Sequence, residues 1–328
     1  MSINVKPLVS IVTPFYNTDR YLAECIESAL LQSYKNWEYV LVNNCSTDRS
    51  LEIAQKYAMV DSRIRIINND RFLTIQAQNY NHALRQISPE GKYCKIIQAD
   101  DWLFPECLTE MVRVAEENPT VGMVGSYWLN DKIVLGSGLR YPSTFVSGSD
   151  ICRFHLLNHP DFFIFGTATS LLIRSDIIRN RDPFYDESSI LEDLELCYEL
   201  LGNCDFGFVH QVLTFTRVDN ESLTGQISDF FPYLLHAFIC LKKYGQLYLN
   251  KEEYDKRLET ISKRYFQALA KGFLNKRDKD FWDYHECGLR SIGYKFSRLQ
   301  LSKYVLWELL DLLRHPKTAV LTLIKNVT

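Results

Sequence analysis

The sequence predicts an α/β fold, in which a mostly parallel central sheet has helices on both faces and a helical C-terminal region follows. Strand-like and helix-like segments alternate through the first half of the chain. The strand-like segments are continuous apolar runs, as expected for parallel strands that are buried on both faces. The last part of the chain has helical patterns only. We therefore expect an α/β domain over residues 1–225 and a helical region over residues 226–328.

The elements of the first domain are short and are separated by turn-rich segments. Strands are expected over residues 8–13, 38–42, 63–67 and 93–97. The spacing of apolar residues predicts helices over residues 20–32, 49–58 and 74–87. Ser46 or Thr47 can cap the second of these helices. A fourth helix is expected from about Pro105 to Glu117, because a proline suits a first helical turn, where its missing N–H costs nothing.

Composition excludes several classes of protein. The chain has 328 residues, and its formal net charge of −3 gives no reason to expect nucleic acid as a partner. The nine cysteines are odd in number and no pair has CxxC spacing, so we interpret them as reduced thiols of a cytosolic protein, mostly packing groups. The N-terminus lacks the pattern of a signal peptide, and no apolar run approaches the length of a membrane-spanning helix. The expected location is therefore cytoplasmic.

Two adjacent carboxylates, Asp100 and Asp101, directly follow the fourth strand in the segment QADDW. Ligands of parallel sheets bind beyond the carboxyl ends of the strands, so the loops PFYNT, NNCST and ADDW should line one crevice. The chain has neither GxGxxG nor GxxxxGK(S/T) to cradle a phosphate. Mg²⁺ or Mn²⁺ held by the two carboxylates would neutralise a phosphate instead. The alternative is a solvated turn or a cap for the following helix.

Two segments of the chain carry recognisable motifs. VSIVTPFYNTDRYLAECIESALLQSYKNWEYVLVNNCSTDRS has a strand ending in PxYN, a helix ending in QxY and a second loop in the place of DDGSTD. KIIQADDWLFP is similar to D-x-D-D followed shortly by proline. Together they resemble family 2 glycosyltransferases of the GT-A fold, over about residues 8–225. The resemblance implies transfer of a sugar from a nucleoside diphosphate donor, usually with inversion at the anomeric carbon.

The resemblance assigns roles to residues of the crevice. Asp100 and Asp101 would hold the metal and the ribose and diphosphate of the donor, with Asp101 on the metal and Asp100 nearer the ribose. Thr13, Pro14 and Tyr16 would shape the nucleotide pocket, largely through backbone and ring contacts.

Two departures from the family pattern bear on the donor and the metal. Asn43 and Asn44 stand where the family usually has two acids. Asn44 can still bind a base through its carbonyl, but its amide also donates and the charge is absent. Uridine is the default base, with guanosine or thymidine as alternatives. Gln98 replaces the first acid of the metal segment, so we expect weaker metal binding with the diphosphate as a major co-ligand.

An inverting transfer needs a carboxylate base, because the acceptor hydroxyl loses its proton as it attacks. The segment SSILEDLELCYELLGN predicts a helix that ends at Gly202 and Asn203. Asp193 shares the apolar side of this helix with Leu196 and Cys197, where a carboxylate is costly unless it is paired or has a task. The family has an ED pair at this helix start with the Asp as base, so the resemblance assigns the base to Asp193. The alternative is a first-turn Asp that the helix dipole favours.

Two further segments resemble parts of the family. FGTATSLLIRSDIIR is similar to a small-residue segment that lines the acceptor side. LTFTRVDNESLT is similar to a segment usually written R-x-H-x-x-S, in which Arg217 matches the arginine and Ser222 the serine. Arg217 could face the diphosphate as a bidentate donor. Asp219 stands at the His position, as an oxygen ligand to the metal or as a plain loop residue.

The C-terminal region ends in an apolar and basic segment. From residue 290 onward it has seven basic side chains and two acidic ones. Basic amphipathic helices with aromatic residues suit an anionic membrane surface, and a lipid-linked acceptor would then lie at the cytoplasmic face. The apolar face expected to enter the membrane consists of Tyr304, Val305, Trp307, Leu309 and Leu312. The alternatives are packing on the catalytic domain or a homodimer contact.

The functional prediction is an inverting glycosyltransferase that moves a sugar from a nucleoside diphosphate sugar, by default a UDP-sugar, to a hydroxyl of a glycan or lipid-linked acceptor in surface polysaccharide synthesis. One alternative is a non-catalytic nucleotide- or carbohydrate-binding homologue, against which the retained Asp100, Asp101 and Asp193 argue. The other is a sugar nucleotidyltransferase, which would need a glycine-rich, basic N-terminal loop that PFYNTDRY does not provide.

Overall fold

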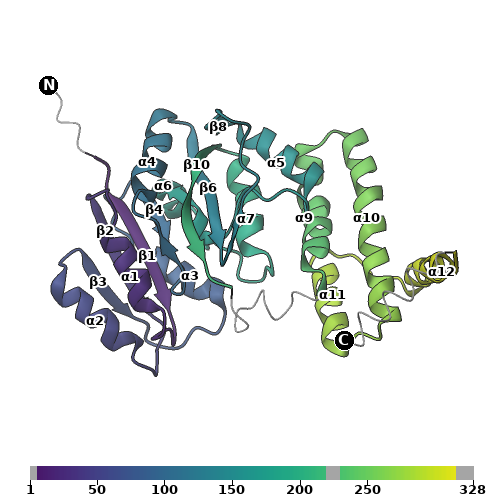
Figure 1. Cartoon of the computed structure of the whole chain (residues 1–328), viewed down its shortest axis with the longest axis horizontal. Coiled ribbons are helices and arrows are strands. Elements are labelled where there is room, and N and C mark those ends of the chain that lie inside the picture. Colours follow the sequence, from purple (N-terminus) through teal and green to yellow (C-terminus); the bar gives the residue numbers. More distant parts are fainter. Residues whose placement is uncertain (1–5, 219–229, 315–328) are drawn as a thin grey trace. The chain divides into compact units, whose positions relative to one another are not determined.

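The computed structural model of the protein describes residues 6–218 and 230–314, without the side chain of Leu312. The chain divides into two compact units, with the boundary between Asp219 and Asn220. The first unit is mixed α/β and the second is helical (Figure 1). The functional roles of the two regions remain predictions.

The first unit is built on one ten-stranded sheet. Its strands are β1 (Val9–Phe15), β2 (Trp37–Asn43), β3 (Ile64–Asn68), β4 (Tyr93–Ile96), β5 (Trp102–Leu103), β6 (Val121–Asn130), β7 (Ile133–Leu135), β8 (Phe145–Val146), β9 (Leu172–Arg174) and β10 (Asp205–Thr216). The order is β3-β2-β1-β4-β9-β6-β10-β5, with β7 beside β6 and β8 beside β10. Neighbours among β1–β4 are parallel, as are β6 and β10, whereas β5, β7, β8 and β9 pair antiparallel. The expected mostly parallel sheet is confirmed.

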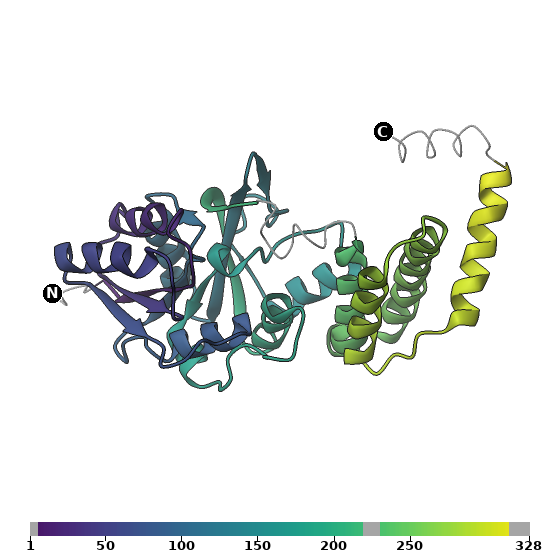
Figure 2. The ribbon, with the colours of Figure 1, turned by 90° about the horizontal axis from the view of Figure 1, so that it is seen from below.

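Helices cover both faces of this sheet. The helices of the first unit are α1 (Leu22–Leu30), α2 (Ser50–Val60), α3 (Gln76–Leu84), α4 (Cys107–Glu117), α5 (Gly148–Asn158), the short 3₁₀ helix η1 (Ala168–Ser170), α6 (Ser175–Arg179) and α7 (Glu192–Leu201). Side chains of α1, α2 and α4 share one hydrophobic core with the sheet, and α3 lies on the opposite face (Figure 2). Every residue of β1 is buried, and its sequence is apolar except for Ser10 and Thr13, whose hydroxyls are hydrogen-bonded within the protein. None of the nine cysteines, all of which lie in the described ranges, forms a disulfide, and most are buried, as expected of packing groups.

Two expectations about helix starts are wrong. Neither Ser46 nor Thr47 caps α2, because both hydroxyls instead accept hydrogen bonds from Asn17, at 3.2 Å each. The helix begins at Ser50, directly after the N-cap residue Arg49. In the other case, α4 begins at Cys107, so the proline two residues earlier precedes the helix rather than lying in its first turn.

The second unit is helical, as expected from its sequence. Its long helices are α9 (Pro232–Tyr248), α10 (Lys251–Leu274), α11 (Lys279–Ser291) and α12 (Arg298–Arg314). Asn250 and Glu253 form a capping box at the start of α10. Aromatic side chains fill the interior of the second unit, where Phe238 stacks on Tyr265 with ring centroids 5.4 Å apart. Among the described helices, none combines the length and the apolar character needed to cross a bilayer.

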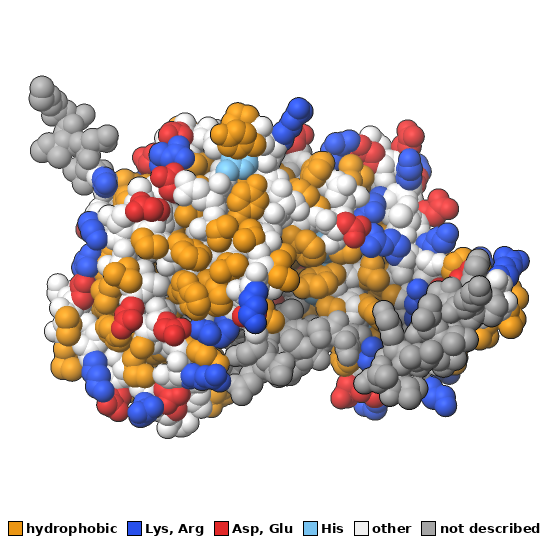
Figure 3. All heavy atoms as spheres, in the orientation of Figure 1, with side chains coloured by type: hydrophobic (Ala, Val, Ile, Leu, Met, Phe, Trp, Pro, Cys, Tyr) orange, Lys and Arg blue, Asp and Glu red, His pale blue; other side chains and the backbone are white. Residues whose placement is uncertain are grey.

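The exposed apolar face of α12 differs from the expected one. Tyr304 stacks on Phe266 of α10 with ring centroids 5.8 Å apart, and Glu308 is buried, so this side of the helix packs within the unit. The expectation for Tyr304 is therefore wrong, and Val305 is half-buried. The exposed apolar side chains are Leu299, Leu306, Trp307, Leu309, Leu310 and Leu313. In Figure 3, where this helix is seen nearly end-on at the right edge, hydrophobic and basic side chains are visible around it.

Candidate active site

The acid pair lies in the short connection between β4 and β5. Asp101 is 2% exposed, and its carboxylate accepts hydrogen bonds from Thr169 Oγ1 (2.6 Å) and from the N–H of Arg217 (3.0 Å). Thr216 Oγ1 lies 3.5 Å from the same oxygen that Thr169 contacts. Burial, and secondly the charge of Asp100, raise the pKa of Asp101 to about 7 despite these hydrogen bonds. Asp100 is the more exposed of the two acids.

An antiparallel strand pairing places Thr169 beside the acid pair. β9 pairs with β4, so the η1 turn just before β9 lies beside the end of β4. The hydroxyl of Thr169 accepts a hydrogen bond from the N–H of Gln98 (3.0 Å) and donates to Asp101. A hydroxyl can do both at once, so this side chain joins the turn to the loop after β4 at two points.

Asp193 approaches the same turn from α7. The Tyr185 hydroxyl and the N–H of Ala168 lie near its carboxylate, and both favour the ionised form. Burial, and secondly the charge of Glu192, raise its pKa to about 7. Ala168 and Thr169 are consecutive residues, so one short turn hydrogen-bonds the strand-end acid and lies beside the helix acid.

Tyr80 of α3 connects the surroundings of the two acids. It is buried, it lies near the side chain of Gln98, and its ring centroid lies 5.8 Å from that of Tyr185. Burial raises the pKa of Tyr80, and the negative charges of Asp193 and Asp101 raise it further. No motif in the sequence singled out Tyr80 or Tyr185, because their positions depend on packing between α3 and the segment before α7.

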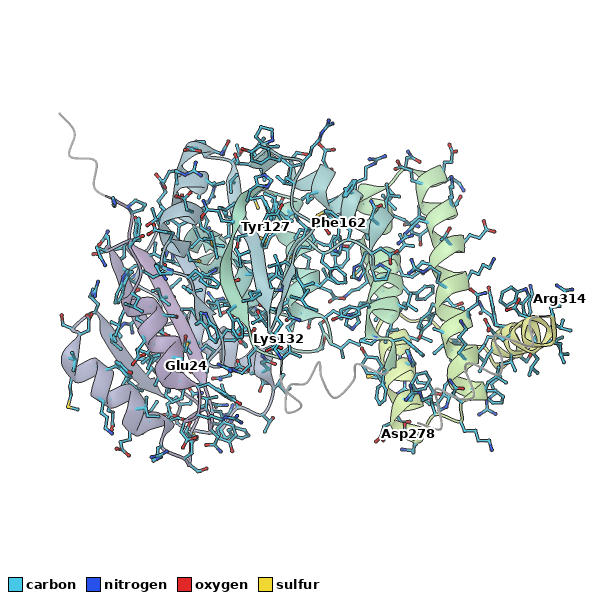
Figure 4. The ribbon with its side chains drawn as sticks, viewed as in Figure 1. Glu24, Tyr127, Lys132, Phe162, Asp278 and Arg314 are labelled. Atoms are coloured by element: carbon cyan, nitrogen blue, oxygen red, sulfur yellow. The ribbon has the colours of Figure 1, made fainter. Side chains whose placement is uncertain are left out.

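Arg217 directly follows β10 and lies at the corner of the acid pair. Its Nε donates to the backbone carbonyl of Asp100 (3.2 Å). Its guanidinium pairs with Glu24 of α1, with Nη2 and Oε2 2.8 Å apart, and lies 4.4 Å from the ring centroid of Tyr21. Glu24 is labelled on α1 in Figure 4. The structure therefore places the predicted Arg217 beside the acids, with its charge paired to a carboxylate that sequence reasoning missed.

The residues expected around the nucleotide divide into buried and exposed ones. Thr13 and Pro14 lie inside β1 and are buried. The Thr13 hydroxyl donates to the carbonyl of Ile97 (2.8 Å), so this side chain joins β1 to the end of β4. Tyr16 follows the strand and is 42% exposed, and its ring centroid lies 4.5 Å from that of Phe72. Of the three, Tyr16 is the one whose ring is available to a ligand.

Asn43 and Asn44 are buried and hydrogen-bonded within the protein. Asn44 Oδ1 accepts hydrogen bonds from the N–H of Leu73 and from Asn69 Nδ2, and Asn44 Nδ2 donates a hydrogen bond to the carbonyl of Leu73. The donor–acceptor distance is 2.9 Å in all three. Asn43 Oδ1 accepts from the N–H of Ser46 (2.9 Å). These amides join the loops that follow β2 and β3. A carboxylate at residue 44 could not donate to Leu73, which gives a structural reason for an amide there.

The site offers oxygen ligands for a cation. Among the residues that the structure describes, no three His, Cys, Asp or Glu side chains gather as a metal-binding group. Two carboxylates fit Mg²⁺ or Mn²⁺ when water and a diphosphate supply the remaining ligands. The other expected ligand, Asp219, and the matched Ser222 lie outside the described residues.

Comparison with known proteins identifies related chains. Residues 10–171 match the model of the family described as glycosyl transferase family 2. Glycosyltransferase GlyG of Streptococcus pneumoniae is 32% identical over 149 residues, which cover 45% of this chain and 46% of GlyG. TuaG of Bacillus subtilis, which is named for teichuronic acid biosynthesis, is 37% identical over 98 residues, or 30% of this chain and 38% of TuaG. The chain thus matches less than half of the length of these relatives.

A solved structure shares the fold. TarS of S. aureus, residues 1–349 in complex with UDP-GlcNAc, has a TM-score of 0.63 and 17% identity, over 87% of this chain and 80% of that one. At this identity the likeness concerns the fold alone, and it confirms the expected architecture. Asp193 and Arg217 lie beyond the residues that match the family model, so the case for their roles rests on the resemblance of their segments and on the geometry around η1.

Proposed function

Because residues 10–171 match the model of glycosyl transferase family 2, we propose that the chain transfers a sugar from a nucleoside diphosphate sugar to a hydroxyl of a glycan or lipid-linked acceptor. One observation supports this above the others. The η1 turn binds Asp101 through the hydroxyl of Thr169, and the N–H of Ala168 in the same turn lies near the carboxylate of Asp193. A strand-end acid suited to a metal and a helix acid suited to a base therefore lie beside the same short turn.

The proposed reaction is a single displacement with inversion. The acceptor oxygen attacks the anomeric carbon, its proton passes to Asp193, and the bond from that carbon to the diphosphate oxygen breaks, with its electron pair leaving on the diphosphate. A general base works best when its pKa is near the operating pH. The raised pKa of Asp193, about 7, supports this role near neutral pH.

We propose that Asp100 and Asp101 hold Mg²⁺ or Mn²⁺, which would neutralise the leaving diphosphate. Asp101 is fixed by its hydrogen bonds to Thr169 and Arg217, and Asp100 is the more exposed carboxylate. The guanidinium of Arg217 would add a second positive charge toward the diphosphate. We predict that Asp101 contacts the ion and that Asp100 lies nearer the ribose, and separate Asp100→Ala and Asp101→Ala variants test this assignment. Full turnover in excess chelator would contradict the proposal that a metal ion is required.

The donor and the pathway are proposed from the relatives. UDP remains the default nucleotide, supported by the TarS complexes with UDP and UDP-GlcNAc. The name of TuaG supports a role in polysaccharide synthesis. Tyr16 would contribute its exposed ring to the nucleotide pocket. The buried residues Thr13, Pro14 and Asn44 would instead stabilise the segments that form the pocket.

Contact with a membrane at the cytoplasmic face is a further part of the proposal. Leu299, Leu306, Leu310 and Leu313 recur along α12 at helical spacing, so they lie on one exposed side. The neighbouring basic side chains Arg298, Lys303 and Arg314 are also exposed. Glu308, an acid of the same helix, is buried on the other side. Leucines flanked by cations suit an anionic lipid surface, which would present a lipid-linked acceptor.

The test is a donor screen on the full chain. We expect thermal stabilisation by UDP-sugars that increases with Mn²⁺, and release of UDP when an acceptor is supplied. Stabilisation by another nucleotide alone would change the proposed base. Binding of a nucleotide sugar without turnover, against a broad set of glycan and lipid-linked acceptors, would favour the non-catalytic homologue.

A further inference from the structure

Lys95 is a fully buried lysine in β4, 0% exposed. Its Nζ donates to the backbone carbonyls of Thr169 (2.6 Å) and Leu171 (3.1 Å) and lies 3.6 Å from Met111 Sδ. Burial lowers the pKa of this amine. The reaction proposed above gives Lys95 no role, because its side chain points between the sheet and α4.

A lysine in this position is expensive for the fold. Taking an ammonium group out of water costs free energy that backbone carbonyls repay only in part. An apolar side chain of similar length, such as methionine, would pack in the same space without that cost. The presence of a lysine is therefore best explained by the two carbonyls that it binds.

Both carbonyls belong to the segment that holds the acids. Thr169 lies in η1 and Leu171 directly follows it. The hydroxyl of the same Thr169 donates to Asp101, and the N–H of the preceding Ala168 lies near the carboxylate of Asp193, whose ionised form it favours. Lys95 thus binds the turn from inside the protein, while the other side of the turn hydrogen-bonds Asp101 and lies near Asp193.

We propose that Lys95 is a positioning residue that fixes the η1 turn and so sets Asp101 and Asp193 relative to each other. This inference rests on the proposed glycosyl transfer, in which one acid acts at the diphosphate and the other at the acceptor. A displacement of about 1 Å in such an arrangement can cost about a hundredfold in rate. Lys95 contacts no substrate in this scheme.

The test compares Lys95→Met with Leu108→Ala. Leu108 is an apolar residue buried on α4 and its side chain makes no hydrogen bond to the turn, so its replacement destabilises the same unit without releasing η1. Both variants should have a lower Tm. Only Lys95→Met should lose turnover, by about a hundredfold, and require more Mn²⁺ for half-maximal activity. Amide hydrogen exchange over residues 167–171 should also increase in Lys95→Met alone.

Wild-type turnover and exchange in Lys95→Met, or an equal loss of turnover in Leu108→Ala, would overturn the inference. If Lys95→Met does not fold, Lys95→Gln decides. Its amide is one bond shorter and cannot reach both carbonyls unless the turn moves, so kcat should fall and exchange should increase; wild-type values of both would again overturn the inference. Absence of transfer by the wild-type chain would refute the proposed function instead, and the exchange measurement would still test the contact between Lys95 and the turn.

Discussion

Thr169 Oγ1 donates a 2.6 Å hydrogen bond to the buried carboxylate of Asp101. Thr169→Val keeps the shape of the side chain but leaves this acceptor without one of its donors. We expect a loss of about 1–3 kcal/mol in the free energy of unfolding, measured by urea denaturation, because an unsatisfied buried acceptor carries its desolvation cost. Thr169→Ser should retain most of the stability.

Thr214 provides a matched control for that substitution. Its hydroxyl is also fully buried, but it has no hydrogen-bond partner. Thr214→Val should therefore be neutral or stabilising. Equal losses in the two Thr→Val variants would mean that the bond to Asp101 has no special importance for the fold.

Asp193→Asn should lower kcat by at least about a hundredfold, the usual scale for a general base. Donor binding, measured by calorimetry, should barely change, because the base acts on the acceptor. In the wild-type enzyme kcat should rise with pH through about 7, as Asp193 ionises. Glu199→Gln, on the same helix, should keep normal turnover. Normal turnover in Asp193→Asn would mean that Asp193 is not the base and is only a first-turn acid that the helix dipole favours.

The raised pKa of Asp193 also predicts a pH dependence of stability. Its pKa rises from 3.8 to about 7 on folding, so between these values the folded chain keeps a proton that the unfolded chain has released. Its contribution to stability is therefore present below about pH 4 and is lost as pH rises toward 7. Asp193→Asn should remove a slope of up to about 1.4 kcal/mol per pH unit. Parallel stability curves for the wild-type and variant chains between pH 4 and 7 would contradict this.

Asn44→Asp should destabilise the first unit by about 1–3 kcal/mol at neutral pH, because a carboxylate oxygen would face the carbonyl of Leu73. A protonated aspartic acid can donate to that carbonyl, so the loss should shrink as pH falls. Asn36→Asp is the control, since Asn36 also donates to a carbonyl, that of Lys6, but at an exposed position. It should change stability by less than about 0.5 kcal/mol.

The leucines of α12 predict binding to anionic vesicles. The double variant Leu306→Asp and Leu310→Asp should float less with such vesicles than the wild-type chain, and the wild-type binding should weaken as salt rises, because the attraction of the basic residues is screened within about 10 Å at 0.1 M salt. Leu247→Asp replaces an exposed leucine of α9 and should leave binding unchanged. If the wild-type chain ignores vesicles and the double variant changes its oligomeric state, the leucines form a contact between copies.

The sequence was most informative where chemistry and chain position coincide. Asp100 and Asp101 follow a strand, and the ligand edge of a parallel sheet follows from that order alone. Asp193 was found because a carboxylate on an apolar helix face needs an explanation. Strand bounds deviate by at most two residues, and the largest deviation is at the end of β1, which continues through Pro14 to Phe15.

What remained hidden depends on contacts between distant segments. Thr169 reaches Asp101 because β9 inserts beside β4, and no local pattern predicts that pairing. The roles of Lys95 and Asn44 depend on which carbonyl each faces. On α12 the hydrophobic period was visible, but residues on both sides of the helix are apolar, so the sequence did not indicate that Tyr304 packs on Phe266.

The ion pair between Arg217 and Glu24 affects how donor binding should respond to salt. A free arginine that binds a phosphate neutralises a hydrated charge, and that attraction weakens steeply with ionic strength. Here the guanidinium already has a carboxylate partner at 2.8 Å, so an arriving diphosphate would exchange one anion for another. The electrostatic gain is then a difference between two similar interactions. Donor affinity should vary less with ionic strength in the wild-type chain than in a Glu24→Gln variant. In that variant no carboxylate of residue 24 would compete with the diphosphate for Arg217.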